Sequence, residues 1–506
     1  MRNKLKVIVL AAVLTAMAAV PVEAEHVVII AANDTHSQID PASDGQGGVL
    51  RRRAIYDQVR RDNKNTVTVH AGDAVQGTVY FSLFGGEVEY ALIDSLGYDM
   101  IVMGNHEFDN GLESVAGYYR NVKAKKLSVN YDFSGTVMEG LTEPYVIKAY
   151  GDKRVAFFGI NVSPYGLISA KNFAGMRYIR SLDVADATAR FLKEVLKVDY
   201  TVMVSHIGYD SYDPEEPNDV DVIHSSHYID LVIGGHSHTV VKPGTEYARV
   251  ANADGRMIPI GQNGKSGKFV TTYDLDLETG AVEQKLIAVD ASWDQAAQAY
   301  PDLEAWLAWH KHGVDSLMNN PVCTSARHMK NSSAAAQNWV SDATMAIMPA
   351  LSGITDVQFA IMNKGGIRCD MPEGTVTEGL LNSMFPFDNR FMVLEITGAD
   401  LLDALKVMAG RGGDAMSREL RVTYNDQGEI TSAKLKGKKI DPKKTYCLAT
   451  IDYLANGGDY MTPFERAKRL YEDDVKYGDR ILDYAKQLQT QGKAIDSTDE
   501  VRMVKK

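Results

Sequence analysis

The alternation of strands and helices is the feature that most constrains the fold of this chain. From residue 26 to about residue 290, short runs rich in β-branched residues alternate with segments whose apolar residues recur at helical spacing. This pattern predicts an α/β domain whose strands are buried on both faces. The predicted strands are Val27–Ile30, Thr66–Val69, Met100–Met103, Val155–Ile160, Thr201–Val204 and Leu231–Ile233, and the predicted helices include Val49–Arg61 and Val184–Leu196.

Residue types that bind metals directly follow five of these predicted strands. Loops at the carboxyl ends of strands gather along one edge of an α/β sheet, which is where ligands bind. We therefore expect the side chains of these five loops to converge. The loops carry Asn33-Asp34-Thr35-His36, Gly72-Asp73, Gly104-Asn105-His106-Glu107-Phe108-Asp109, Ser205-His206 and Gly234-Gly235-His236-Ser237-His238.

The polar residues of these loops divide into two sets of metal ligands. Imidazole and carboxylate groups bind zinc, manganese and similar divalent ions, and an asparagine adds a neutral oxygen. Two such ions can activate a shared water for attack on phosphorus. An isolated Asp-x-His or Gly-Asp pair is often structural. Five such motifs, each at the end of a predicted strand, favour a metal site, although they do not identify the metal. The first predicted set is Asp34, His36, Asp73 and His238, and the second is Asp73, Asn105, His206 and His236, with Asp73 bridging.

His106 is the imidazole that this division leaves over. If Asn105 binds a metal, the adjacent side chain can point across the site towards a phosphate, where a cation stabilises developing charge or protonates the leaving oxygen. Asp109, three residues further on, can hold the other ring nitrogen and raise the pKa of His106. His106 and Asp109 are therefore the predicted catalytic pair. His70, three residues before Asp73, is a further candidate for a supporting role.

A change of pattern follows the α/β region. Residues 292–318 predict one long helix that Asn319-Asn320-Pro321 ends. We predict a catalytic domain at 25–291, a helical linker at 292–325 and a smaller α+β domain at 326–506. The elements predicted in this last domain are a helix at Ser332–Met348, a strand at Val357–Met362, a helix at Ala399–Ala409, a hairpin around 424–428 and a strand at Tyr446–Ile451.

The first 24 residues predict export to the periplasm or the medium. Arg2, Lys4 and Lys6 precede an apolar stretch, Val7–Val20, and small residues lead to a cleavage site near Ala24. The alternative is a transmembrane anchor, but 14 residues of helix cover only about two-thirds of a bilayer core. We therefore expect no stable membrane span.

Charge and cysteine content limit the partners and the covalent framework. The formal charge is −12 and no long basic run is present, which argues against nucleic-acid polymers and anionic membranes as main partners. Three cysteines, Cys323, Cys369 and Cys447, cannot form a disulfide framework, although one bridge is allowed in an oxidising compartment. The oligomeric state stays open.

The motifs in the five loops resemble those of the calcineurin-like metallophosphoesterase superfamily. Domain order and length are similar to the 5′-nucleotidase family, whose periplasmic members include UDP-sugar hydrolases. The resemblance implies a four-layer α/β/β/α catalytic domain followed by a C-terminal domain that binds the nucleoside. It also implies a metal-dependent enzyme that hydrolyses nucleoside 5′-monophosphates to nucleoside and phosphate by attack of a metal-activated hydroxide, with other nucleotides as further candidate substrates.

The same resemblance implies substrate-binding residues in the second domain. Asn363-Lys364-Gly365-Gly366-Ile367-Arg368 is similar to the family's Asn-x-Gly-Gly-x-Arg segment. Arg368 would bind phosphate oxygens and Asn363 the base or ribose. Phe387 and Tyr453 would stack on the two faces of a nucleobase, and Asp459 would hold the ribose hydroxyls.

One position departs from the family pattern. Lys330 stands where family members usually carry an arginine, and a lysine offers one point charge in place of a bidentate fork. Phosphate recognition is therefore expected to be weaker or different. A UDP-sugar hydrolase, a 2′,3′-cyclic phosphodiesterase/3′-nucleotidase and a non-catalytic nucleotide-binding or surface-adhesion protein remain alternatives, although the loop ending in Asp459 favours the 5′-nucleotidase branch.

Overall fold

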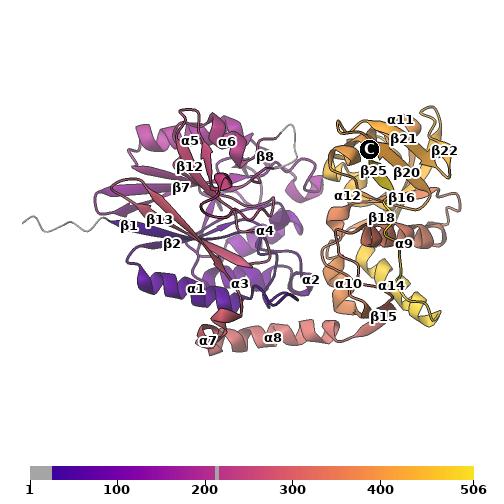
Figure 1. The fold of residues 1–506 in the computed structure, drawn as a ribbon, viewed down its shortest axis with the longest axis horizontal. Helices are drawn as coiled ribbons and strands as arrows, with labels where there is room; N and C mark the ends of the chain where they lie inside the picture. Colours follow the sequence, from indigo (N-terminus) through magenta and orange to yellow (C-terminus); the bar gives the residue numbers. More distant parts are fainter. Residues whose placement is uncertain (1–24, 211–215) are drawn as a thin grey trace, which may run out of the picture.

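The computed structural model describes residues 25–210 and 216–506. The predicted export signal at 1–24 lies outside the described residues. The chain forms two α/β regions connected along one side by a helix, α8 (Pro301–Met318) (Figure 1). Within the described residues, no helix combines the length and the apolar character that crossing a bilayer requires.

Two six-stranded sheets form the first region, with the strand orders β14-β13-β1-β2-β3-β4 and β11-β12-β10-β9-β7-β6. Neighbours from β1 to β4 are parallel, as are β7, β9, β10 and β12. The first sheet contains β1 (His26–Ala32), β2 (Thr66–Ala71), β3 (Met100–Val102), β4 (Lys125–Leu127), β13 (Phe269–Asp276) and β14 (Val282–Ala288). The second contains β6 (Tyr145–Tyr150), β7 (Lys153–Asn161), β9 (Tyr200–His206), β10 (Leu231–Ile233), β11 (Arg249–Ala251) and β12 (Met257–Gly261).

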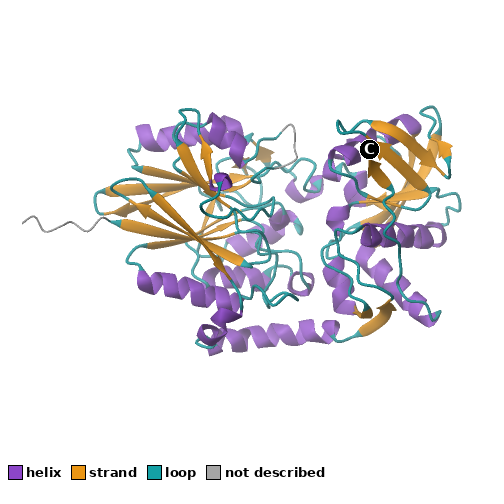
Figure 2. Cartoon of the chain, in the orientation of Figure 1, coloured by secondary structure: helices purple, strands orange, loops and turns teal. Residues whose placement is uncertain are grey.

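The two sheets pack face to face, and helices cover their outer faces. A buried apolar cluster that includes Val27, Val69, Phe157 and Val204 joins the inner faces. Figure 2 shows helices on both outer sides of the paired sheets. The predicted four-layer α/β/β/α arrangement is therefore confirmed. On one side lie α1 (Val49–Asp62), α2 (Val79–Phe84), α3 (Glu87–Ser95) and α4 (Gly111–Tyr119), and on the other α5 (Ser181–Glu194) and α6 (Asp219–Ser225).

The prediction of a single helix over 292–318 is wrong. The segment contains a 3₁₀ turn at Ala291–Trp293, a short helix α7 (Asp294–Ala297) and then α8, whose first residue is Pro301. Proline has no N–H to continue a preceding helix and disfavours helical backbone in the residue before it. Tyr300 accordingly leaves the helical region, with φ −120° and ψ 54°.

The second region has a five-stranded sheet, β19-β16-β23-β18-β24, and a four-stranded sheet, β22-β21-β20-β25. The predicted helices and strands of this region all occur, with ends shifted by a few residues. Its strands are β15 (Pro321–Ser325), β16 (Phe359–Met362), β17 (Gly374–Thr377), β18 (Arg390–Thr397), β19 (Ala415–Met416), β20 (Leu420–Tyr424), β21 (Ile430–Leu435), β22 (Lys438–Lys439), β23 (Thr445–Ile451), β24 (Lys468–Lys476) and β25 (Met503–Lys505). Its helices are α9 (Ala334–Ser352), α10 (Glu378–Met384), α11 (Gly398–Gly410), α12 (Asp452–Ala455), α13 (Thr462–Glu465) and α14 (Tyr477–Thr490).

Helix α8 lies against both regions, because it packs on α2 of the first and on α10 of the second. Phe84 of α2 contacts the ring of His310 at a centroid distance of 5.0 Å. The predicted domain boundaries stay predictions, but β15, within the predicted linker, pairs with β17 of the second region. All three cysteines are free thiols.

Candidate metal centre and substrate cavity

The five loops converge at the carboxyl edge of the paired sheets. Their carboxylate and imidazole ligand atoms form three overlapping groups, each with all of its atoms within 4.8 Å of one another. Asp73 and His36 each belong to two groups, so the groups make one continuous centre. They are Asp34/His36/His238, His36/Asp73/His106 and Asp73/His206/His236.

Members of each predicted ligand set lie close together, although the group His36/Asp73/His106 also contains the imidazole that the prediction leaves out of both sets. In the first set, the Nε2 atom of His238 lies 2.9 Å from Nε2 of His36 and 3.3 Å from Oδ1 of Asp34. In the second, Nε2 of His206 lies 3.2 Å from Oδ2 of Asp73. Asn105, the amide predicted for the second set, has its Oδ1 atom 2.9 Å from Nδ1 of His236.

Several of these side chains have buried ligand atoms without hydrogen-bond partners, in surroundings that favour positive charge. Oδ1 of Asp34 and Nε2 of His206 are buried with no hydrogen-bond partner. Nδ1 of His206 lies 2.7 Å from the carbonyl oxygen of Ala71 and donates to it, so Nε2 is the nitrogen whose proton a metal would replace. Burial alone would lower the pKa of His206, but Asp73 and Asp34 raise it to about 10. The surrounding field therefore favours positive charge, and the donor set fits divalent cations.

The backbone around the ligands is locally strained. Five predicted ligands have positive φ, namely Asp34 (48°), His36 (47°), Asp73 (54°), His236 (85°) and His238 (56°). Such angles are uncommon for non-glycine residues, although Asp and His adopt them more often than most, and they occur frequently at functional sites. Close packing also requires a glycine at 104, because a Cβ atom there would collide with the side chains of Asp73 and His206.

His106 and Asp109 form the contact expected of a catalytic pair. Nδ1 of His106 lies 2.9 Å from Oδ2 of Asp109, and the imidazole remains 13% exposed to the cavity. Burial lowers the pKa of His106, but the carboxylates of Asp109 and Asp73 outweigh it and raise the pKa above its usual value. The ring lies 5.4 Å from that of His36, so the imidazole adjoins the ligands.

Glu107 belongs to the same motif, but its role did not follow from the sequence. Its Oε2 atom accepts hydrogen bonds from the backbone N–H groups of Asp73 (3.0 Å) and Gly104 (2.6 Å), and Oε1 accepts one from Ala74 (2.8 Å). This buried carboxylate thereby connects the loops that follow β2 and β3. His70 is also buried, with Nε2 3.1 Å from the hydroxyl of Thr35, between two predicted ligands.

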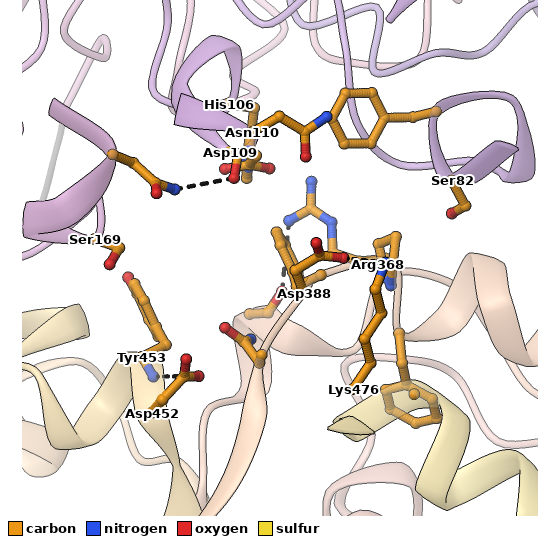
Figure 3. A pocket seen from close by; sticks show the side chains of 18 of the residues that line it. Ser82, His106, Asp109, Asn110, Ser169, Arg368, Asp388, Asp452, Tyr453 and Lys476 are labelled. Atoms are coloured by element: carbon orange, nitrogen blue, oxygen red, sulfur yellow. Dashed lines mark hydrogen bonds and ion pairs between the residues drawn. The ribbon is translucent and has the colours of Figure 1, made fainter. Parts of the chain in front are cut away.

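A cavity of about 590 Å³ opens beside His106, between the two regions. Figure 3 shows Ser82, His106, Asp109, Asn110 and Ser169 approaching it from the first region and Arg368, Asp388, Asp452, Tyr453 and Lys476 from the second. Five of the six predicted substrate-binding residues line this cavity: Asn363, Arg368, Phe387, Tyr453 and Asp459.

Arg368 and Phe387 lie next to the catalytic pair. The guanidinium carbon of Arg368 is 5.7 Å from the ring centroid of Phe387, and this ring lies 5.8 Å from that of His106. Burial lowers the pKa of Arg368, while Asp73, Asp109 and Asp34 oppose this effect. The carboxylates of this centre therefore attract the guanidinium group of Arg368. A bound phosphate would compete with them for that group.

Tyr453 and Asp459 also connect the two regions. The hydroxyl of Tyr453 lies 3.0 Å from Oδ1 of Asp459 and 3.3 Å from the carbonyl oxygen of Gly166 in the first region. Oδ2 of Asp459 forms an ion pair of 2.8 Å with Arg411. Arg411 was not foreseen, since no sequence motif marks it.

Lys330 is the one predicted substrate-binding residue that lies apart from the others. Its side chain is exposed and lies outside the residues that line the cavity. Its backbone carbonyl accepts a hydrogen bond from Ser333, at the start of α9. Its predicted part in phosphate recognition stays a prediction.

Comparison with protein families matches both regions. Residues 27–240 match the calcineurin-like phosphoesterase model, and residues 316–466 match the model of the 5′-nucleotidase C-terminal domain. Among curated proteins, an apyrase of Tabanus yao is 25% identical over 513 residues, covering 90% of both chains. A 5′-nucleotidase of Mus musculus is also 25% identical, over 85% of this chain and 83% of its own.

The fold is shared with a solved structure as well. The 5′-nucleotidase precursor from Thermus thermophilus superposes with a TM-score of 0.82 at 24% sequence identity, covering 95% of this chain and 99% of the other. Both regions thus occur together, in the same order, in the relatives.

Proposed function

We propose that this chain, which belongs to the 5′-nucleotidase family of calcineurin-like phosphoesterases, hydrolyses nucleoside 5′-monophosphates to nucleoside and phosphate with two divalent cations. The observation that carries the proposal is the continuity of the metal centre with a nucleoside-sized cavity. His106 borders both, since it lies with His36 and Asp73 among the ligand groups and also lines the cavity.

Seven side chains would hold the cations. The first cation would take Asp34, His36 and His238, the second Asn105, His206 and His236, and Asp73 would serve both. When bound, such cations acidify water and neutralise charge on phosphoryl oxygens. Zinc and manganese both suit this mixture of nitrogen and oxygen ligands.

The remaining residues orient the phosphate and move a proton. Protonated His106, supported by the carboxylate of Asp109 at 2.9 Å, would stabilise the charged oxygens and donate a proton from Nε2 to the leaving O5′ atom. Arg368 would bind a non-bridging phosphate oxygen. Both groups lie on the cavity side of the ligands, which supports this division of roles.

The nucleoside would occupy the cavity of about 590 Å³. Phe387 and Tyr453 would stack on the base, Asn363 would bind polar atoms of the base or ribose, and Asp459 would accept hydrogen bonds from the ribose hydroxyls. Asp459 is held by Arg411 and by the Tyr453 hydroxyl, so a ribose would have to share or displace these contacts. A rearrangement of the two regions about α8 would accompany binding.

We further propose export, with cleavage near Ala24, because a predicted signal sequence precedes the first described strand. An export assay with the full-length chain tests this proposal. Retention of residues 1–24 in the mature protein would overturn it.

Phosphate release from AMP, measured with and without a chelator, tests the activity. We expect release that stops on metal removal and returns when zinc or manganese is added. A panel of AMP, 3′-AMP, 2′,3′-cyclic AMP and UDP-glucose separates the proposal from a 3′-nucleotidase, a cyclic phosphodiesterase and a UDP-sugar hydrolase. Tight nucleotide binding by the metal-loaded protein without any turnover would instead favour a non-catalytic binding protein.

A further inference from the structure

A second cavity adjoins the metal centre on the side of His238. Its volume is about 620 Å³, and it lies between the two regions, since His238 and Lys265 line it from the first region and the remaining residues from the second. Arg368 and Gly365 line both this cavity and the nucleoside cavity. The loop that carries Arg368 therefore forms the boundary between the two spaces.

Within the part of the chain that the structure describes, three cations line this second cavity without a salt bridge: Lys265, Arg368 and Lys364, whose Nζ atom donates to the carbonyl oxygen of Arg411. Within the described residues, neither Lys265 nor Arg368 forms a salt bridge, and the only hydrogen bond of the Arg368 side chain is a long one of 3.5 Å to the carbonyl oxygen of Gly365. Burial lowers the pKa of Lys265, and the charges of Arg368 and Lys268 lower it further, against the attraction of Asp34 and Asp370. Lys265 and Arg368 line the same cavity, and the charge of Arg368 acts on the ammonium group of Lys265.

The two acidic residues that line this cavity each contact an arginine, of which Arg411 is shared with Asp459. Asp414 pairs with Arg411 at 3.2 Å, and Glu500 pairs with Arg421 at 2.7 Å. The amide side chains of Asn331 and Gln337 also line the space and can donate hydrogen bonds. The cavity therefore offers three cations without a salt bridge, together with neutral donors, which is a surface that suits a phosphate group.

We propose that Lys265 and Arg368 form a second phosphate subsite, which binds a phosphate group other than the one held at the metal centre. The proposal rests on the function proposed above. A nucleoside monophosphate brings one phosphate, which the metal ligands and Arg368 receive, and leaves Lys265 uncompensated. A nucleoside diphosphate brings a second phosphate, and hydrolysis releases free phosphate. Either source could supply the group that Lys265 binds.

The test compares Lys265→Ala with Lys242→Ala in the metal-loaded full chain. Lys242 is an exposed lysine outside both cavities, so its replacement controls for the loss of one charge. The readouts are the dissociation constant of α,β-methylene-ADP by calorimetry, the KM for AMP and the inhibition constant of inorganic phosphate. Calorimetry needs no turnover, so it reports on the subsite even if AMP hydrolysis fails.

We expect Lys265→Ala to raise the dissociation constant of α,β-methylene-ADP by about tenfold. The KM for AMP should rise by a factor at least about five times smaller. This result assigns the subsite to the substrate. A weakening confined to inorganic phosphate assigns it to the released product, and also supports an anion subsite. Equal changes for AMP and α,β-methylene-ADP, or values matching those of Lys242→Ala throughout, would overturn the proposal.

Discussion

Replacement of Glu107 by glutamine isolates the contribution of one buried carboxylate to the metal centre. The change keeps the shape of the side chain but exchanges an oxygen that only accepts hydrogen bonds for an NH₂ group that only donates them. In the native protein the two oxygens accept three backbone N–H groups, those of Asp73, Gly104 and Ala74. Because glutamine has one accepting oxygen, at least one of these donors loses its partner.

The size of the effect follows from this geometry. If the amide oxygen takes the Oε2 position, the bonds from Asp73 and Gly104 survive with a neutral acceptor, and the N–H of Ala74 faces an NH₂ group. An unsatisfied buried donor costs about 1–3 kcal/mol. Burial and the charge of Asp73 raise the pKa of Glu107 to about 7, so the charge assistance of each surviving bond, up to about 1 kcal/mol, is lost in full only above that pH. The total is about 1–5 kcal/mol. For a domain of this size, that corresponds to a fall in melting temperature of about 2–20 °C.

The metal affinity should fall as well, because Asp73 is the proposed bridging ligand and its own backbone N–H is one of the three donors. Loss of an outer-shell partner typically weakens metal binding by about 10- to 100-fold. Thermal unfolding of the metal-free protein measures the first effect, and zinc or manganese titration by calorimetry measures the second. Glu113→Gln is the matched control, since it removes the same charge from an exposed position on the neighbouring helix α4.

A melting temperature and a metal affinity equal to those of Glu113→Gln would refute the reasoning. Such a result would mean that Glu107 does not hold the two ligand loops together in solution. A fall in stability with unchanged metal affinity would refute only the connection from Glu107 to Asp73.

Variants at three further positions test the catalytic imidazole, the base contact and a buried carboxyl group of helix α3. His106→Ala should lower kcat by about 10²- to 10⁴-fold with unchanged metal content, and a parallel loss of metal would identify His106 as a ligand instead. Tyr453→Ala should raise the KM for AMP by about tenfold or more through lost stacking, whereas Tyr453→Phe, which keeps the ring, should change it less than Tyr453→Ala, and equal effects would argue against stacking. Burial raises the pKa of Glu89 to about 7. The folded state therefore binds the proton more tightly, and this stabilisation is complete below the ordinary value of 4.5 and lost as the pH rises through 7. Glu89→Gln should thus exceed the wild type in stability by about 2–4 kcal/mol at pH 8 and by much less at pH 5 in thermal unfolding, and a pH-independent difference would contradict the assignment.

The metal centre was predictable because its residues follow strands directly. A side chain within a few residues of a parallel strand's end has little freedom in where it lies, so strand order alone brings Asp34, Asp73 and Asn105 to one edge. The single helix predicted over 292–318 is wrong because apolar residues keep helical spacing on both sides of Pro301, whereas this proline begins a new helix.

The second cavity was not predictable for a related reason. Lys265 belongs to a loop of the first region, and its neighbours Arg368 and Asn331 belong to the second. Their proximity depends on how the two regions pack, which no local pattern records. Lys330 illustrates the converse, since its position in the family motif suggested a phosphate contact, yet its side chain lies outside both cavities.

The backbone strain at the ligands and the bonds made by Glu107 belong to one arrangement. Five ligands at positive φ would each cost on the order of 1 kcal/mol, and such angles persist only where the surroundings impose them. Glu107 imposes them at Asp73, and the N–H of His236 donates to Oδ2 of Asp34 at 3.0 Å, which links two loops of different sheets. The ligand atoms are therefore held close together by the protein itself. It follows that cation binding need not order these loops, so that most of the binding free energy remains for holding the cations and, through them, the phosphate.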